Sequence, residues 1–125
     1  MPHILLEGNA RIADLQARHR PFAVREGDRL VKVERFYADA KAEAALVEAL
    51  VVEQGHTQRF LVQVTARPGG LSVRLEPMTD PEKTPGVKRA LAVVADRLRE
   101  AGGLSYGSTN IAEYLVGETP AGGRS

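Results

Sequence analysis

The stretch RFLVQVTARPGGLSVRLEP, residues 59–77, alternates apolar and polar side chains on both sides of a proline–glycine turn. This period of two residues is typical of a β-strand with one buried face. Phe60 and Val62 fall on one face of the first strand, and Leu71 and Val73 fall on the matching face of the second. The intervening RPGG supplies the residues that a hairpin connection requires. The sequence therefore predicts a β-hairpin whose apolar face joins a hydrophobic core.

A second strong pattern, TPGVKRALAVVADRLREAGG, spans residues 84–103. Thr84 can act as the N-cap, and Pro85 takes the first helical position, where its missing N–H costs nothing. Apolar residues then recur at helical spacing, while basic and acidic side chains occupy the other face. We expect an amphipathic helix at about 85–101, ended by Gly102, with one face committed to the core.

Two further segments lie upstream of the hairpin. RLVKVERFYAD, residues 29–39, alternates as a strand with apolar residues on both faces, which is typical of a strand covered on both sides. DAKAEAALVEALVVEQG, residues 39–55, supports two interpretations. Asp39 as an N-cap before strong helix formers favours a helix over 40–53, whereas the β-branched, alternating second half favours a strand. We favour the helix and leave the strand open.

Together these elements predict an α+β fold, with an antiparallel sheet of three or four strands and the helix at about 85–101 packed on one face. Asn9 is a candidate cap for a short helix over 10–18. A chain of 125 residues has a common size for one domain, and we expect a single compact domain over 1–117. The last residues, 118–125, have the composition of a flexible tail.

The types and spacing of the reactive residues exclude several kinds of catalytic and metal site. The chain has no cysteine, which removes disulfides, thiolate nucleophiles and cysteine-ligated metals. His3, His19 and His56 lie in separate segments without a second ligand at metal-binding spacing, so we predict neither a metal nor a cofactor. Glu34 and Glu76 share a face of the predicted sheet, where surface charge pairs explain them better than a catalytic pair. The sequence leans against an enzyme.

Charge and hydropathy say little about location or partners. The chain has 17 Lys plus Arg against 16 Asp plus Glu, a net charge of +1 that names no polyanionic partner. The N-terminal MPHILLEGNAR has neither the basic start nor the apolar length of a signal peptide or membrane span. We therefore expect a protein that does not cross a membrane, and a cytoplasmic location follows by default.

The second face of the predicted sheet carries the main functional prediction. We place Leu30, Phe36 and Leu61 there, with Leu50 and Val52 beside them if the ambiguous segment is a strand. Apolar side chains mixed with arginines are typical of a surface that another chain covers. We predict a non-catalytic module that acts by self-association or by docking a protein partner, with a homodimer as the preferred form.

Two alternative functions stay open. Basic side chains on the same face would bind the phosphates of a nucleic acid or another polyanion. They are Lys32, Arg59, Arg67 and Arg74. Exposed aromatic side chains for base stacking are scarce, which weighs against nucleic acid. The third alternative is nucleotide or phosphate binding in the loop at 106–113, where Ser108, Thr109 and Asn110 precede a predicted short helix.

Overall fold

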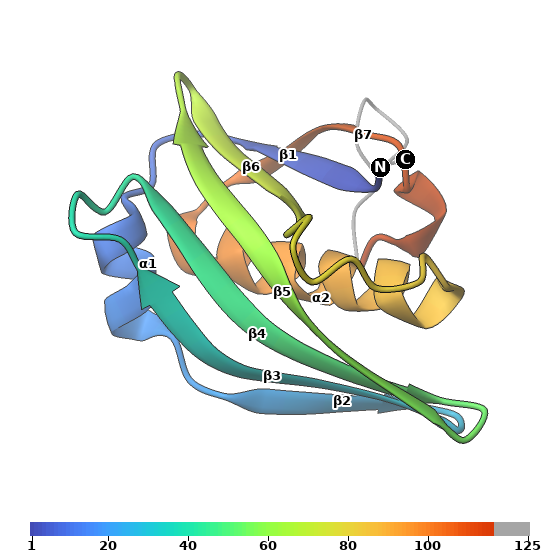
Figure 1. The fold of residues 1–125 in the computed structure, drawn as a ribbon. Coiled ribbons are helices and arrows are strands. Elements are labelled where there is room, and N and C mark those ends of the chain that lie inside the picture. The colour runs from blue at the N-terminus through green and yellow to red at the C-terminus, as the bar shows by residue number, and fades with distance from the viewer. Residues whose placement is uncertain (117–125) are drawn as a thin grey trace.

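The structure is a computed structural model that describes residues 1–116. Its strands are β1 (His3–Glu7), β2 (Phe22–Glu26), β3 (Arg29–Ala38), β4 (Ala44–Glu53), β5 (His56–Arg67), β6 (Gly70–Leu75) and β7 (Ser105–Thr109). Its helices are α1 (Ile12–Arg18), α2 (Pro85–Gly102) and the 3₁₀ turn η1 (Ala112–Tyr114). Figure 1 shows the strands curving around α2.

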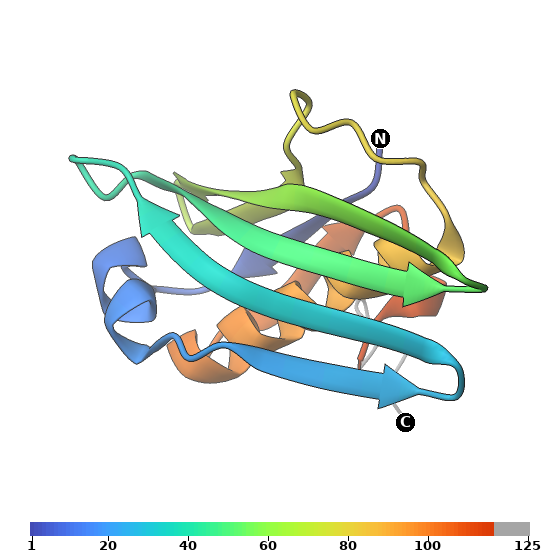
Figure 2. The same ribbon diagram turned by 60° about the horizontal axis from the view of Figure 1, so that its bottom comes forward.

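One antiparallel sheet contains all seven strands, in the order β2-β3-β4-β5-β6-β1-β7. The sheet curls into a half-barrel, and α2 lies along its concave side (Figures 1 and 2). The predicted sheet of three or four strands is therefore wrong. The strands β1, β2 and β7 are absent from the prediction because their short segments, HILLE, FAVRE and SYGST, do not alternate apolar and polar residues.

The ambiguous segment forms strand β4, and the helix favoured over 40–53 is wrong. β4 pairs with β3 on one side and with β5 along its full length on the other. Asp39 caps no helix, and instead its Oδ1 accepts a hydrogen bond from the Glu43 N–H at 3.0 Å in the turn before β4. Pairing on both edges outweighs the local helix propensity, which is a weak preference per residue.

A β-bulge in β3 decides the side on which Phe36 lies. Two residues of β3, Glu34 and Arg35, stand opposite the single Glu48 of β4. The extra residue breaks the simple alternation of the strand. Phe36 therefore points into the core, where it is 8% exposed and its ring centroid lies 5.5 Å from that of His19. The prediction that Phe36 lies on the second face of the sheet fails for this reason.

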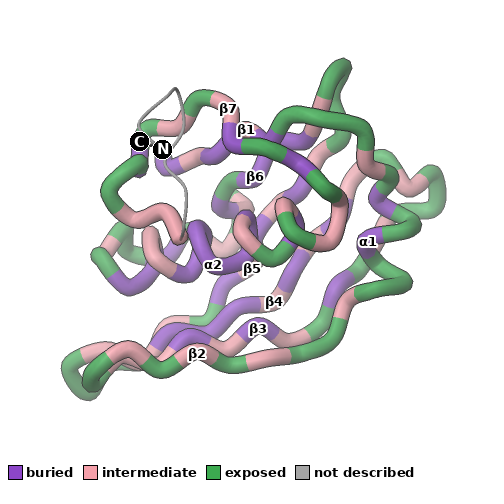
Figure 3. Tube along the Cα trace, turned by 180° about the vertical axis from the view of Figure 1, so that it is seen from behind, coloured by how far each residue is buried: buried purple, intermediate pink, exposed green. Residues whose placement is uncertain are grey.

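The hydrophobic core lies between the concave side of the sheet and α2, where Figure 3 shows the buried residues concentrated. The helix predicted at about 85–101 is present as α2, and Thr84 Oγ1 accepts a hydrogen bond from the Val87 N–H at 3.2 Å. The left-handed backbone of Gly103, with φ of 65°, ends the helix. Its buried apolar residues include Leu91 and Leu98.

The carboxylate of Glu53, at the end of β4, binds the N-terminus of α2. Its Oε2 accepts a hydrogen bond from the Gly86 N–H at 3.0 Å, and the Thr84 hydroxyl donates to its Oε1. Glycine at position 86 leaves room for this contact, because a Cβ atom there would lie 2.5 Å from the carboxylate and displace it. The negative charge also complements the helix dipole. The β4–β5 hairpin is thereby fixed to the start of the helix.

The ends of the described chain differ in part from expectation. The short helix α1 buries Ile12 and Leu15, and its N-cap residue is Arg11, so the predicted cap Asn9 has no such role. The predicted tail, 118–125, lies outside the described residues. Within residues 1–116, no helix combines the length and the apolar character that crossing a bilayer requires.

Candidate functional site

The face of the sheet turned away from α2, which we call the outer face, has no helix packed on it within the described residues (Figure 2). Its side chains come from alternate positions of β3, β4 and β5, with the adjoining turn after β6. The register between strands arranges them in rows that cross the sheet. Because the strands are antiparallel and well paired, each row is a fixed set of neighbours.

Two adjacent rows carry opposite charge. The first, which we call the basic row, consists of Lys32, Leu50 and Arg59. The second, which we call the acidic row, consists of Glu34, Arg35, Glu48, Leu61 and Glu76. Two cations thus lie beside a row with three carboxylates and one guanidinium.

An apolar pair flanks each charged row. Leu30 and Val52 pair across β3 and β4 beyond the basic row, and Tyr37 and Leu46 pair beyond the acidic row. Leu30, Val52 and Leu46 are partly buried, and Tyr37 is 44% exposed. The outer face is therefore amphipathic along the strands, with its charges in the middle and apolar side chains on both sides.

Hydrogen bonds hold two of the three carboxylates of the acidic row, those of Glu48 and Glu76, in place. The Tyr37 hydroxyl donates to Glu48 Oε2 at 3.0 Å, and the backbone N–H of Arg35 donates to Glu48 Oε1 at 3.3 Å. Gln63 Nε2 donates to Glu76 Oε2 at 3.0 Å. The bulge in β3 thus serves to orient Glu48. A charged group already held in position loses less conformational entropy when it binds.

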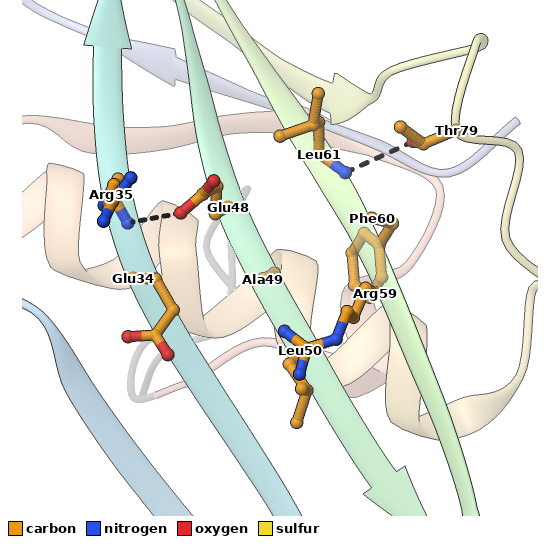
Figure 4. Close-up of a pocket in the computed structure, with 9 residues that line it drawn as sticks. All are labelled: Glu34, Arg35, Glu48, Ala49, Leu50, Arg59, Phe60, Leu61 and Thr79. Carbon is orange, nitrogen blue, oxygen red and sulfur yellow. Dashed lines mark hydrogen bonds between the residues drawn. The ribbon is translucent and has the colours of Figure 1, made fainter.

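A hollow of about 410 Å³ lies over both charged rows (Figure 4). Its lining includes Glu34, Arg35, Glu48, Arg59, Leu61 and Thr79. One wall is the turn after β6, where the Leu61 N–H donates to Thr79 Oγ1 at 3.2 Å. Figure 4 shows Arg59 extending from β5 towards Leu50, which is only 8% exposed. The hollow therefore presents charges of both signs over an apolar floor.

The structure brings two of the three predicted partner-face residues to this surface. Leu30 and Leu61 lie on the outer face, while Phe36 lies in the core on the other side of the sheet. Leu50 joins them because its segment is a strand. Glu48 and Tyr37 are missed from the sequence, since the helix interpretation and the unforeseen bulge hide their positions. The alternation within residues 45–51 is the signal that could have placed Glu48.

The four predicted polyanion-binding residues are only partly brought together. Lys32 and Arg59 share the basic row, and Lys32 Nζ lies 3.5 Å from Glu34 Oε1. Arg74 lies on β6 beyond the acidic row, where its guanidinium donates to Ser72 Oγ at 3.2 Å. Arg67 lies at the far end of β5, beyond the same row. Carboxylates therefore separate the basic groups from one another.

The predicted phosphate loop has a structural role in joining β1 to β7. Thr109 Oγ1 donates to the His3 carbonyl at 2.7 Å, and Asn110 Oδ1 accepts from the His3 N–H at 2.9 Å. Ser108 is exposed on β7. The helix expected behind the loop is the three-residue turn η1. The loop-to-helix geometry on which the phosphate prediction depends is thus not formed, and binding itself stays a prediction.

The part of the chain that the structure describes contains no set of metal ligands. Within residues 1–116, no group of three His, Asp or Glu side chains is placed to hold a metal ion. Comparisons with protein-family models, with curated proteins and with solved structures find no match to this chain. The outer face therefore provides the structural features from which a function can be inferred.

Proposed function

We propose that this protein is a non-catalytic interaction module that binds a protein surface through the outer face. The observation that carries the proposal is the position of exposed hydrophobic side chains. Apart from Met1, the large hydrophobic residues exposed within 1–116 are Tyr37, at 44%, and Met78, at 92%. Tyr37 lies on the outer face, and Met78 lies in the turn that borders it. Tyrosine and methionine are enriched where protein surfaces bind.

The charged groups of the outer face also support binding over catalysis. Glu48 and Glu76 accept hydrogen bonds from neighbouring side chains and backbone, as carboxylates do in a positioned binding surface. General acid–base catalysis requires a carboxyl or histidine directed at substrate with a pKa suited to the reaction. The carboxylates in the described lining of the hollow are Glu34, which lies 3.5 Å from Lys32 Nζ, and Glu48, which accepts two hydrogen bonds. This lining contains neither a histidine nor a serine.

A photo-crosslinking amino acid at Leu61 tests this function in the cells from which the chain comes. We expect an adduct with a specific protein at Leu61, and none when the same group replaces Ala13, which is exposed on α1. Combining Tyr37→Arg with the crosslinker at Leu61 should reduce the amount of adduct, because the substitution places a permanent positive charge at an apolar contact. Mass spectrometry of the adduct identifies the bound chain. The same crosslinking amino acid at Lys32 probes a second position on the outer face. If neither Leu61 nor Lys32 yields an adduct above that of Ala13, the proposal is wrong.

Polyanion binding through Lys32 and Arg59 is the second prediction. No structural observation favours it, because the acidic row adjoins these two residues and separates them from Arg67 and Arg74. Nucleotide or phosphate binding at 106–113 is the third, and it lacks a helix N-terminus to receive an anion.

A further inference from the structure

We propose that the outer face binds the outer face of a second copy of this chain, and that a two-fold axis relates the two copies. This axis runs parallel to the sheet, at right angles to the strands, and passes between the basic and acidic rows. This inference rests on the proposed function, and it names the partner and the arrangement. A second copy fits because the outer face is complementary to itself in both charge and apolar character.

Rotation by 180° about this axis turns the second copy over and reverses the direction of its strands. Along β3, β4 and β5, where the rows lie, each strand then overlies the same strand of the other copy, in the aligned mode of sheet-on-sheet packing. The basic row of each copy lies over the acidic row of the other. Lys32 meets Glu34 of the second copy, and Arg59 lies over Leu61 between Glu48 and Glu76. Both contacts form twice, as a two-fold interface requires.

The same rotation matches the apolar pairs that flank the charged rows. Leu30 and Val52 of one copy lie over Tyr37 and Leu46 of the other, because the two pairs are equally distant from the axis in the register. One operation therefore covers the apolar side chains and pairs the charges. Side chains that are only partly buried in one copy become enclosed, which is favourable in proportion to the apolar area removed from water.

The charges of the two rows balance. The basic row has two cations, Lys32 and Arg59, and the acidic row has three carboxylates less the guanidinium of Arg35, a net of two negative charges. A partner of uniform charge would leave one row facing like charge, which is unfavourable. The hollow lies over both rows and hence on the axis, where it gives room for Arg59 from each copy.

Charge-swap variants test the arrangement. Lys32→Glu with Arg59→Glu makes both rows acidic, and Glu34→Lys with Glu48→Lys makes both rows basic. We expect the wild-type chain to be a dimer by native mass spectrometry and sedimentation velocity, and each double variant alone to be a monomer. An equimolar mixture of the two should form a heterodimer, because every row then faces its opposite charge. Circular dichroism shows whether each variant is folded.

A matched control changes the same number of charges elsewhere. Arg67→Glu with Arg11→Glu alters two exposed basic residues outside the rows, and this variant should stay a dimer. For the wild type, we expect the dissociation constant to rise at least about tenfold between about 0.05 and 0.5 M salt, since the exposed rim of the contact is screened. This measurement needs no variant, and a dimer insensitive to salt would overturn the row-on-row contact.

The outcomes separate this inference from the proposed function. A wild-type chain that is monomeric up to about 1 mM overturns self-association, while a Leu61 adduct with a different protein would still uphold the interaction module. A dimer unaffected by either double variant overturns the outer face as its interface. Folded monomeric variants that fail to form a heterodimer overturn the two-fold arrangement and leave the outer face as the binding surface.

Discussion

The two faces of one sheet differ sharply although the same strands build them. On the inner face, valines from β3, β5 and β6 such as Val31, Val62 and Val73 are completely buried against α2. On the outer face, the intervening positions hold lysine, arginine, glutamate and partly buried leucine. The inner face needs only size and apolarity, since its partner is a helix of the same chain. The outer face combines a charge pattern with apolar side chains, and no helix of the described chain covers it.

The largest expected change in the free energy of unfolding comes from comparing two neighbouring residues on opposite faces. Phe36→Ala should lower the free energy of unfolding by about 3–5 kcal/mol, because it removes a buried aromatic ring from the core. Tyr37→Ala should cost less than about 1 kcal/mol, since surface substitutions have small effects. Urea unfolding of both variants measures the difference. Equal losses would show that the bulge does not place the two side chains on opposite faces.

The next effect concerns the edge where β2 closes the inner face. Arg89 on α2 donates to Glu26 of β2 through Nε at 3.1 Å and Nη2 at 2.7 Å, and to the carbonyl of Tyr114 at 2.6 Å. Hydrogen bonds to charged groups contribute about 1.5–3 kcal/mol, so Arg89→Met should lower the free energy of unfolding by about 2 kcal/mol. Lys88→Met, one residue earlier, is the matched control and should change it much less.

The same contact predicts a pH dependence. The hydrogen bond from Arg89 lowers the pKa of Glu26 below its ordinary value of 4.5. A carboxyl with a lowered pKa in the folded state stabilises the protein above its unfolded pKa, and this stability is lost as the pH falls through the folded value. The difference in unfolding free energy between the wild type and Glu26→Gln should be constant near neutral pH and shrink below about 4.5. A difference independent of pH from about 7 to 3 would contradict the ion pair.

A smaller effect is expected on the outer face. Arg59→Ala should change the free energy of unfolding by less than about 0.5 kcal/mol when measured at concentrations where the chain is monomeric. The reason is that Arg59 is exposed and contributes to no ion pair within the described residues. Thermal unfolding followed by circular dichroism measures it. A loss near that of Arg89→Met would mean that this arginine serves the fold rather than a partner.

The smallest signal is expected with nucleic acid. Because carboxylates adjoin Lys32 and Arg59, titration with single- and double-stranded DNA and RNA should give no binding that weakens steeply with salt. Fluorescence anisotropy at two salt concentrations measures it. Salt-sensitive binding that Lys32→Glu with Arg59→Glu abolishes would replace protein docking by the polyanion hypothesis.

Periodicity alone predicts the elements that form their own pattern. The β5–β6 hairpin and α2 are both evident in the sequence, since alternation and helical spacing run for many residues. β4 is not, because its identity depends on pairing with β3 and β5, which local propensity does not contain. The short strands β1, β2 and β7 likewise acquire their structure from neighbours distant in sequence.

The residues of the candidate site can be predicted from the sequence only where simple alternation holds. Leu30, Lys32, Arg59 and Leu61 follow from simple alternation and do lie on the outer face. The bulge inserts one residue in β3, so alternation places Phe36 and Tyr37 on the wrong sides beyond it. The position of Glu48 on the outer face depends both on the bulge and on its segment being a strand. The arrangement in rows is a property of the register, which one strand cannot specify by itself.

The place of β1 in the sheet has a consequence for how the chain acquires its fold during synthesis. β1 lies between β6 and β7, and Glu7 and Ser105 are 98 residues apart. β1 leaves the ribosome before either neighbour, so it has no partner strand until the hairpin of β5 and β6 has emerged, and it remains an open edge until β7 follows. Contacts so distant in sequence slow folding, and unpaired strand edges invite association with other chains. The nascent chain is thus most vulnerable to misassembly before residue 109 has left the ribosome.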